Sequence, residues 1–373
     1  MRVYLIVFTP DYEGIRKIAA LYFYREVKMG SKLKTYNEVK EYLRKKERTA
    51  HLLLGNGFSM AYNHKIFSYN ALHQFIEKQE DPLITSLFDI VKTKNFELVM
   101  QQLDNFCELI DVFGSDNDLL DKVETASERL KESLIDAVES LHPEHVFKLQ
   151  ESQIDKCSAF LSFFTNNDGS VFSTNYDLLL YWVLMRKGAK NAIDGFGRDR
   201  EDDGGYDDEP EYSELRWGNN KSNQNIYYLH GALPIFDEGV HITKEEYTGT
   251  KYLLENIKRR IDHGHYPVFV ASGNGEEKLE HILHNRYLTF CYDSLCEIQG
   301  SLVTFGFNFG KYDYHIIDAI NIAAKQGRRS GNKLFSVYIG VYSDDDRKHI
   351  ERIKDKFKCK VTLFDAATAN VWA

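Results

Sequence analysis

The segment HLLLGNGFS, residues 51–59, decides the fold class, because a short apolar run ends there in a glycine-rich turn. An apolar run of this length is typical of a buried strand, and the glycines indicate a tight turn that enters a helix. A helix also precedes the strand, since Thr35 and Glu38 have the spacing of a capping box. This order of helix, strand, turn and helix is typical of an α/β protein.

The same order of strand and helix is predicted in the second half of the chain, where short apolar runs alternate with helical patterns. The predicted strands are residues 171–174, 226–229, 267–271, 302–305, 334–341 and 360–364, and the predicted helices include 177–185, 276–282 and 314–325. Strands that alternate with helices imply crossover connections and a parallel sheet with helices on both faces. We therefore predict a Rossmann-like, doubly wound, mainly parallel sheet.

Between these two parts the sequence looks helical throughout, with apolar residues at a spacing of about 3.6. We predict an inserted helical subdomain over residues 70–165, and a Rossmann-like domain built from residues 35–69 and 166–373. Residues 1–34 form a predicted N-terminal extension. One hypothesis is that translation starts at Met29, which a mass spectrum of the native protein with Met1 intact would contradict.

Composition limits the classes of function. The chain has 373 residues and a net charge of −9, so direct nucleic-acid binding is not expected. No run approaches about 20 apolar residues, so no membrane span is predicted. The five cysteines are scattered without a C-x-x-C pair, which predicts neither a metal site nor a disulfide framework and fits a reducing, cytoplasmic setting.

Ligands of open α/β sheets bind in the crevice outside the carboxyl ends of the strands. Polar or glycine clusters stand at five predicted strand ends: residues 55–59, 173–177, 230–231, 272–275 and 306–310. A nucleotide would lie across such ends.

The first cluster allows two interpretations. Gly55 and Gly57 would let the backbone approach a pyrophosphate, with the amides of Phe58 and Ser59 facing the phosphates. Alternatively, the turn only needs a positive φ, because the third glycine of the dinucleotide fingerprint is missing.

The next clusters are equally open when each is taken alone. Asn175 would serve as a helix N-cap as readily as a ligand, and Asp177 would serve as a first-turn carboxylate. His230 would be a structural histidine, although Gly231 beside it leaves room for the ring to face the crevice.

Taken in order, these motifs resemble those of a known family. Gly-Asn-Gly-Phe-Ser, Ser-Thr-Asn-Tyr-Asp, Leu-His-Gly and Phe-Gly-Phe-Asn-Phe-Gly resemble the SIR2 superfamily, including SIR2-like proteins of bacterial anti-phage defence and the DUF4917 family. The resemblance runs from about residue 36 to 345. It implies catalytic roles for Asn175 and His230. It also implies that NAD is bound by Gly55, Asn56, Gly57, Phe58, Ser59, Thr174, Asp177, Gly306 and Asn308.

The resemblance implies hydrolysis of NAD as a substrate, by a defence effector that acts through abortive infection. Asn175 would orient the ribose and an attacking water, and His230 would accept a proton with a pKa suited to neutral pH. No metal is required. The four-cysteine zinc module of deacylating sirtuins has no counterpart here, which argues against peptide deacylation.

Three other readings remain open. One is a NAD- or nucleotide-sensing subunit without turnover, and another is a protein ADP-ribosyltransferase or deacylase. The third is a partner of a HerA-type DNA-translocating ATPase, a role that is compatible with NAD hydrolysis. Because an effector that destroys NAD must be held silent, we expect a homo-oligomer.

Overall fold

The computed structural model describes residues 32–63, 82–92, 96–114, 117–143, 145–187, 191–198, 214–247, 252–270, 274–325 and 333–373. Contacts within the chain separate Met1–Lys34 from Thr35–Ala373. The hypothesis about Met29 concerns residues that lie outside the described ones.

A parallel sheet forms the core, as predicted, and it has seven strands. In spatial order its strands are β1 (Lys34–Thr35), β12 (Lys360–Asp365), β11 (Leu334–Val341), β10 (Gly300–Phe305), β2 (Ala50–Leu54), β3 (Val171–Ser173) and β6 (Ile226–Tyr228). Neighbouring strands from β12 to β6 all pair in parallel. Every residue of β2 and β10 is buried, as expected for central strands covered on both faces. The predicted Rossmann-like α/β class is confirmed.

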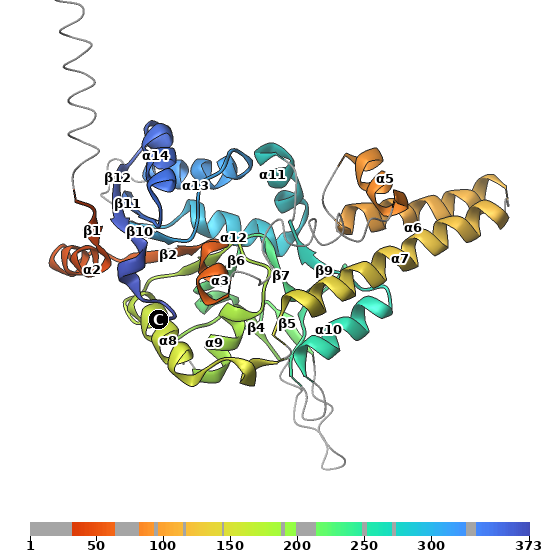
Figure 1. The fold of residues 1–373 in the computed structure, drawn as a ribbon, viewed down its shortest axis with the longest axis horizontal. Coiled ribbons are helices and arrows are strands. Elements are labelled where there is room, and N and C mark those ends of the chain that lie inside the picture. The colour runs from red at the N-terminus through yellow and green to blue at the C-terminus, as the bar shows by residue number, and fades with distance from the viewer. Residues whose placement is uncertain are drawn as a thin grey trace, which may run out of the picture. The chain divides into compact units, whose positions relative to one another are not determined.

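Helices cover both faces of this sheet (Figure 1). One layer holds α12 (Arg286–Cys296), α13 (Tyr314–Lys325) and α14 (Asp344–Ile353), and the other holds α8 (Glu151–Thr165) and α9 (Leu179–Lys187). Although α8 falls in the range predicted for the helical subdomain, it packs on β2 and β3. The predicted capping box is present at α2 (Tyr36–Lys45), where Thr35 and Glu38 cap each other.

The strand order reverses in the middle of the sheet. The path β2, β3, β6 moves toward one edge, whereas β10, β11, β12 moves toward the other, and β2 and β10 lie side by side. A reversal of this kind is the topological switch point at which open α/β sheets bind ligands.

A second, five-stranded sheet was not predicted. Its order is β4 (Phe196–Gly197), β5 (Leu215–Trp217), β8 (Ile242–Lys244), β7 (Gly231–Asp237) and β9 (Pro267–Phe269), and its pairs are antiparallel. The assignment of residues 267–271 to the parallel sheet was therefore wrong. The chain turns at Gly231, whose φ is +77°, and β7 then offers an edge to β9. An apolar run does not show which edge it will pair with.

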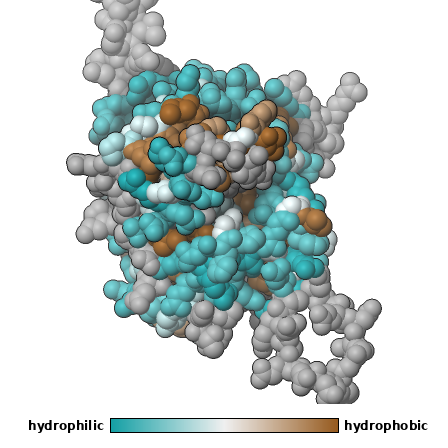
Figure 2. All heavy atoms as spheres, turned by 90° about the vertical axis from the view of Figure 1, so that its right-hand side faces the viewer, coloured by the Kyte–Doolittle hydropathy of each residue, from teal (hydrophilic) through white to brown (hydrophobic). Residues whose placement is uncertain are grey.

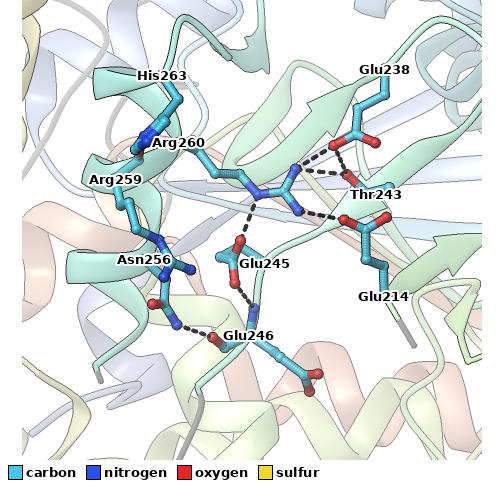
Figure 3. Close-up of polar contacts among 9 residues, drawn as sticks. All are labelled: Glu214, Glu238, Thr243, Glu245, Glu246, Asn256, Arg259, Arg260 and His263. Carbon is cyan, nitrogen blue, oxygen red and sulfur yellow. Dashed lines mark hydrogen bonds and ion pairs between the residues drawn. The ribbon is translucent and has the colours of Figure 1, made fainter. Parts of the chain in front are cut away.

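Arg260 ties the second sheet together (Figure 3). It lies on α10 (Leu253–Asp262), and its side chain is 16% exposed. Its nitrogens reach carboxylates at 2.6 Å on Glu245, 2.5 Å on Glu238 and 3.2 Å on Glu214. One planar group with several donors thus links three segments of chain around this sheet.

The helical region contains α5 (Pro82–Val91), α6 (Phe96–Phe113) and α7 (Asn117–Leu141). The long helices α6 and α7 pack along each other and extend to the right in Figure 1. Ile90, Val112 and Phe113 are largely exposed there, and Figure 2, which views that side, shows hydrophobic patches among hydrophilic ones. Within the described ranges, no helix is both long and apolar enough to cross a membrane, and no cluster of side chains suits a metal ion.

The remaining elements are short. They are α3 (Gly57–Tyr62), α11 (Gly275–His284), and the 3-10 helices η1 (Val146–Lys148), η2 (Lys221–Asn223), η3 (Lys311–Asp313), η4 (Lys354–Lys356) and η5 (Ala366–Ala369). Of these, α3 and α11 begin close to the carboxyl edge of the parallel sheet, where the site is built.

Candidate functional site

The sheet brings four of the predicted polar clusters to one edge. Leu54 is in register with Phe305 on one side and with Ser173 on the other, and Ser173 is in register with Tyr228. The strands β10, β2, β3 and β6 therefore end together. The residues that follow these four ends leave the same edge of the sheet, which neither their order nor their spacing in the sequence required.

The two glycine turns touch at the switch point between β2 and β10. The amide of Gly57 donates to the carbonyl of Gly306 at 2.9 Å, and the amide of Gly55 donates to the carbonyl of Phe305 at 3.1 Å. A Cβ on Gly57 would stand 2.6 Å from the Cα of Gly306. Gly306 itself has a φ of +69°. Close backbone contact between the turns therefore explains these glycines.

The amides expected to face phosphates have partners inside the turn. Phe58 donates to the carbonyl of Gly55 at 2.8 Å, and Ser59 donates to that of Asn56 at 3.1 Å. The following helix, α3, has only six residues. This arrangement corrects the expectation of a phosphate cradle made by these two amides, because a turn of this tightness uses them for its own closure.

The side chain of Ser59 instead joins the first cluster to the second. Its hydroxyl donates to Oδ2 of Asp177 and accepts from Nδ2 of Asn175 at 3.0 Å. The other carboxylate oxygen of Asp177 accepts from the amide of Leu179 at 2.9 Å, which caps the start of α9. The three side chains are buried, with exposures of 0%, 2% and 7% for Ser59, Asp177 and Asn175. These predicted residues come from segments more than 110 positions apart, and hydrogen bonds join their side chains into one network.

Burial raises the pKa of Asp177 to about 6, and the hydrogen bonds from Ser59 and from the Leu179 amide oppose that rise. A buried carboxyl group with a raised pKa, at the end of a strand, is the kind of perturbed group that gathers at functional sites. The capping interpretation of Asp177 is confirmed by its bond to the Leu179 amide, and its role in ligand binding stays a prediction.

The other predicted binding residues differ in how far their side chains are buried. Thr174 is fully buried, and its hydroxyl donates to the carbonyl of Leu54 at 3.2 Å, so it acts in the sheet edge itself. Asn56 contacts the sulfur of Met60 at 3.2 Å. Asn308 is exposed beyond the second glycine turn.

His230 follows β6, the neighbour of β3, and points to a different partner from that of Asn175. Its Nε2 lies 2.9 Å from Nε2 of His315, a residue in the first turn of α13. The exposures are 0% for His230 and 2% for His315. The two predicted catalytic residues therefore leave adjacent strands, but Asn175 bonds to Ser59 and His230 to His315.

The pKa of His230 lies well below its ordinary value, because the ring is buried and because His315, Lys278 and His281 oppose a positive charge. Burial likewise lowers the pKa of His315 to about 3. The expectation of a His230 pKa suited to neutral pH is therefore wrong. Burial therefore favours the neutral form of both rings.

Two contributors near the site were missed by the sequence reasoning. His315 opens a helix that follows the second glycine turn, so a survey of titratable residues in first turns at this edge would have found it. Trp372 carries no such signal. Its indole nitrogen donates to the carbonyl of Phe58 at 2.8 Å, and its ring packs on Phe58 and Tyr62, which fixes α3 from the far end of the chain.

No curated protein matches the chain. A family model described as a domain of unknown function, DUF4917, matches residues 52–372. That range begins in β2 and ends beyond η5, so it includes both glycine turns, the Ser59 network and the histidine pair. The chain belongs to the DUF4917 family.

Proposed function

We propose that this protein is a SIR2-like NAD⁺ hydrolase, which breaks the nicotinamide–ribose bond to give ADP-ribose and nicotinamide. The observation that carries the proposal is the switch point between β2 and β10, with two glycine turns in contact and Asn175 held beside them. In doubly wound sheets, dinucleotides lie across this position. The reaction itself is inferred from the resemblance of the four ordered motifs to SIR2-like proteins.

The chemistry suits a buried amide. When the C–N bond breaks, its electron pair leaves with nicotinamide, and positive charge develops on the ribose. Water then adds to that carbon, and its proton passes to the solvent. Asn175 would orient both the ribose and the water, and its rotation is limited because Nδ2 bonds to Ser59. The leaving group departs without a strong base, so a neutral His230 is compatible with the reaction.

Nicotinamide release by purified full-length protein tests the proposal. Fractions of different oligomeric state should be assayed separately, with and without products of neighbouring genes. We expect Asn175→Ala and His230→Ala each to lower the rate by at least about 10²-fold, the usual size of such contributions. The exposed residues Asn223 and His241 supply matched controls, as Asn223→Ala and His241→Ala.

Full activity in both site variants would remove the assignment of these residues. No release of nicotinamide in any fraction would remove the proposal itself.

A specific observation favours a second candidate, a subunit that binds NAD without turnover. His230 is fully enclosed and already bonded to His315, which suits a structural pair as well as a catalytic group. This alternative predicts NAD binding by calorimetry together with unchanged NAD after long incubation. A defence role, self-association and a HerA-type ATPase partner belong to the same proposal and rest on the resemblance.

A further inference from the structure

The hydrogen bonds around Ser59 can run in only one direction when Asp177 is ionised. An ionised carboxylate only accepts hydrogen bonds, so the single hydroxyl proton of Ser59 goes to Oδ2 of Asp177. Ser59 then has only a lone pair to offer to Asn175, whose amide lies 3.0 Å away. The atom of Asn175 that faces Ser59 must therefore be the donor, Nδ2, and the acceptor Oδ1 is turned away from Ser59.

The acceptor atom of this amide remains open to a ligand. Within the described part of the chain, the side chain of Asn175 makes one hydrogen bond, through Nδ2, and its Oδ1 is not fully buried. The backbone of Asn175 is fixed separately, because its N–H donates to the hydroxyl of Ser173 at 3.1 Å. The bond to Ser59 therefore decides which end of the amide faces outward.

A proton on Asp177 would reverse the direction of these hydrogen bonds. Oδ1 of Asp177 already accepts from the amide of Leu179 at 2.9 Å, so a proton added to the carboxyl is favoured on Oδ2, the oxygen that faces Ser59. The carboxyl would then donate to the oxygen of Ser59, and the hydroxyl proton of Ser59 would turn toward Asn175. A hydrogen bond in that direction needs the oxygen of the Asn175 amide, so the amide has to flip.

The groups that face Asp177 leave its own charge as the one that changes. The Ser59 hydroxyl from α3 and the Leu179 amide from α9 do not titrate between pH 5 and pH 8. On β6, the Tyr228 hydroxyl interacts with the charge of Asp177, and burial raises the pKa of Tyr228 well above its ordinary value, so this hydroxyl is neutral. Burial also favours the neutral form of His230, which follows β6. The pKa of Asp177, raised to about 6, lies within this range.

We propose that ionised Asp177 is a positioning residue for Asn175, and that it acts through the Ser59 hydroxyl to keep Oδ1 of the amide turned toward the ribose and water. This inference rests on the proposed hydrolase function. It gives Asp177 a role in place of the direct contact with NAD expected from the resemblance. It also assigns the loss of activity at low pH to Asp177 and not to His230.

Asp177→Asn tests this role with little change in shape. Its oxygen is needed by the Leu179 amide, so its NH₂ group faces Ser59 and imitates the protonated carboxyl. We expect kcat of the wild type to fall about tenfold per pH unit below about pH 6. We expect Asp177→Asn to be about 10²-fold slower than the wild type at pH 8 and to have a constant kcat from pH 5 to pH 8. The exposed Asp293→Asn is the matched control and should follow the wild type at every pH.

Ser59→Ala removes the link between the two groups. It should lower kcat and abolish the pH dependence near pH 6, and adding Asp177→Asn to it should lower kcat by less than about twofold more. Losses that multiply in the double variant would overturn the proposal, because Asp177 would then act without Ser59. A wild type with constant kcat from pH 5 to pH 8, or a pH profile that survives in Asp177→Asn, would overturn it as well.

A second readout does not depend on activity. In protein labelled with ¹⁵N-asparagine, the side-chain amide signal of Asn175 is the one that disappears in Asn175→Ala. We expect its chemical shift to titrate with a midpoint of about pH 6 in the wild type and to be constant in Asp177→Asn. A signal that does not titrate in the wild type, or that still titrates in Asp177→Asn, would overturn the proposal. If the wild type releases no nicotinamide, the hydrolase proposal fails, and these spectra still decide whether Asp177 controls the amide.

Discussion

At the scale of single residues, the hydroxyl of Ser59 is the junction of the site. It donates to Asp177 and accepts from Asn175, and all three side chains are buried. Removing the hydroxyl leaves one buried acceptor and one buried donor without their partner. Unpaired buried groups cost more than a hydrogen bond contributes.

We therefore predict that Ser59→Ala lowers the free energy of unfolding by about 1–3 kcal/mol. The loss should be larger at pH 8 than at pH 5. The pKa of Asp177 is raised to about 6, so the carboxyl is charged at pH 8 and then needs the donor most. Urea unfolding at both pH values checks this, with Ser86→Ala as the control, since Ser86 is exposed and bonds only within its own helix. An equal loss in the two variants would contradict it.

The sequence identified the residue types of the site better than their contacts. Asn175 and Asp177 stood out because polar residues end an apolar run, and this follows from local pattern alone. Their bond to Ser59 depends on two strands being neighbours, and His315 depends on which helix lies over the end of β6. Pairings across more than 80 residues are decided by packing of the whole sheet, which no local pattern encodes.

At the scale of elements, contact between the two glycine turns sets the spacing of β2 and β10 at the switch point. Gly57→Ala would place Cβ 2.6 Å from the backbone of Gly306, where no flexible side chain can move aside. We predict a loss of about 1–3 kcal/mol in the free energy of unfolding, as in other overpacked sites. Nicotinamide release should fall with it, because the turns separate.

Gly275→Ala is the matched control for that variant. Gly275 is the first residue of α11, its φ is not positive, and its nearest neighbour would be 3.4 Å from the new Cβ. The control should be neutral or stabilised by up to about 1 kcal/mol, because alanine favours helices. If Gly57→Ala is as stable and as active as this control, the turns do not need their close contact.

Elements were predicted well where the signal is local. The capping box at Thr35 and the helix at 314–325 appear as expected, because caps and 3.6-residue periodicity act within a few turns. The second sheet escaped prediction because β9 has only three residues and pairs with β7 some 30 positions earlier. Short apolar strands carry no mark of being parallel or antiparallel.

At the scale of the whole molecule, buried neutral histidines make stability depend on pH. The pKa of His51 is lowered to about 4 and that of His142 and His315 to about 3, in each case mainly by burial. His51 also accepts at Nδ1 from the amide of Ser170 and contacts the Gln299 carbonyl through Nε2, so the neutral ring joins neighbours of β2. Protonation would break the first bond.

The direction in which stability changes with pH follows from proton binding. Below the ordinary pKa of 6.5, the unfolded chain binds protons that the folded chain excludes, so stability present above pH 6.5 is lost as the pH falls. We predict a loss of about 2 kcal/mol per buried histidine between pH 7 and pH 5. Asp177 opposes this by about 1 kcal/mol, because its raised pKa lets the folded state bind a proton in the same window.

Urea unfolding at pH 5, 6 and 7 measures the effect. His51→Gln should reduce the loss by one histidine's share, whereas the exposed His241→Gln should not change it. Stability that stays constant from pH 7 to pH 5 in the wild type would show that these rings are not held neutral.

The central claim is that a dinucleotide lies across the carboxyl edge of the parallel sheet. The most direct test is a structure of the full chain with an NAD analogue whose ribose–nicotinamide link cannot be cleaved. We expect the diphosphate at the junction of β2 and β10, with the nicotinamide ribose within hydrogen-bond distance of Asn175. An analogue bound on another face, or none bound at saturating concentration, would contradict it.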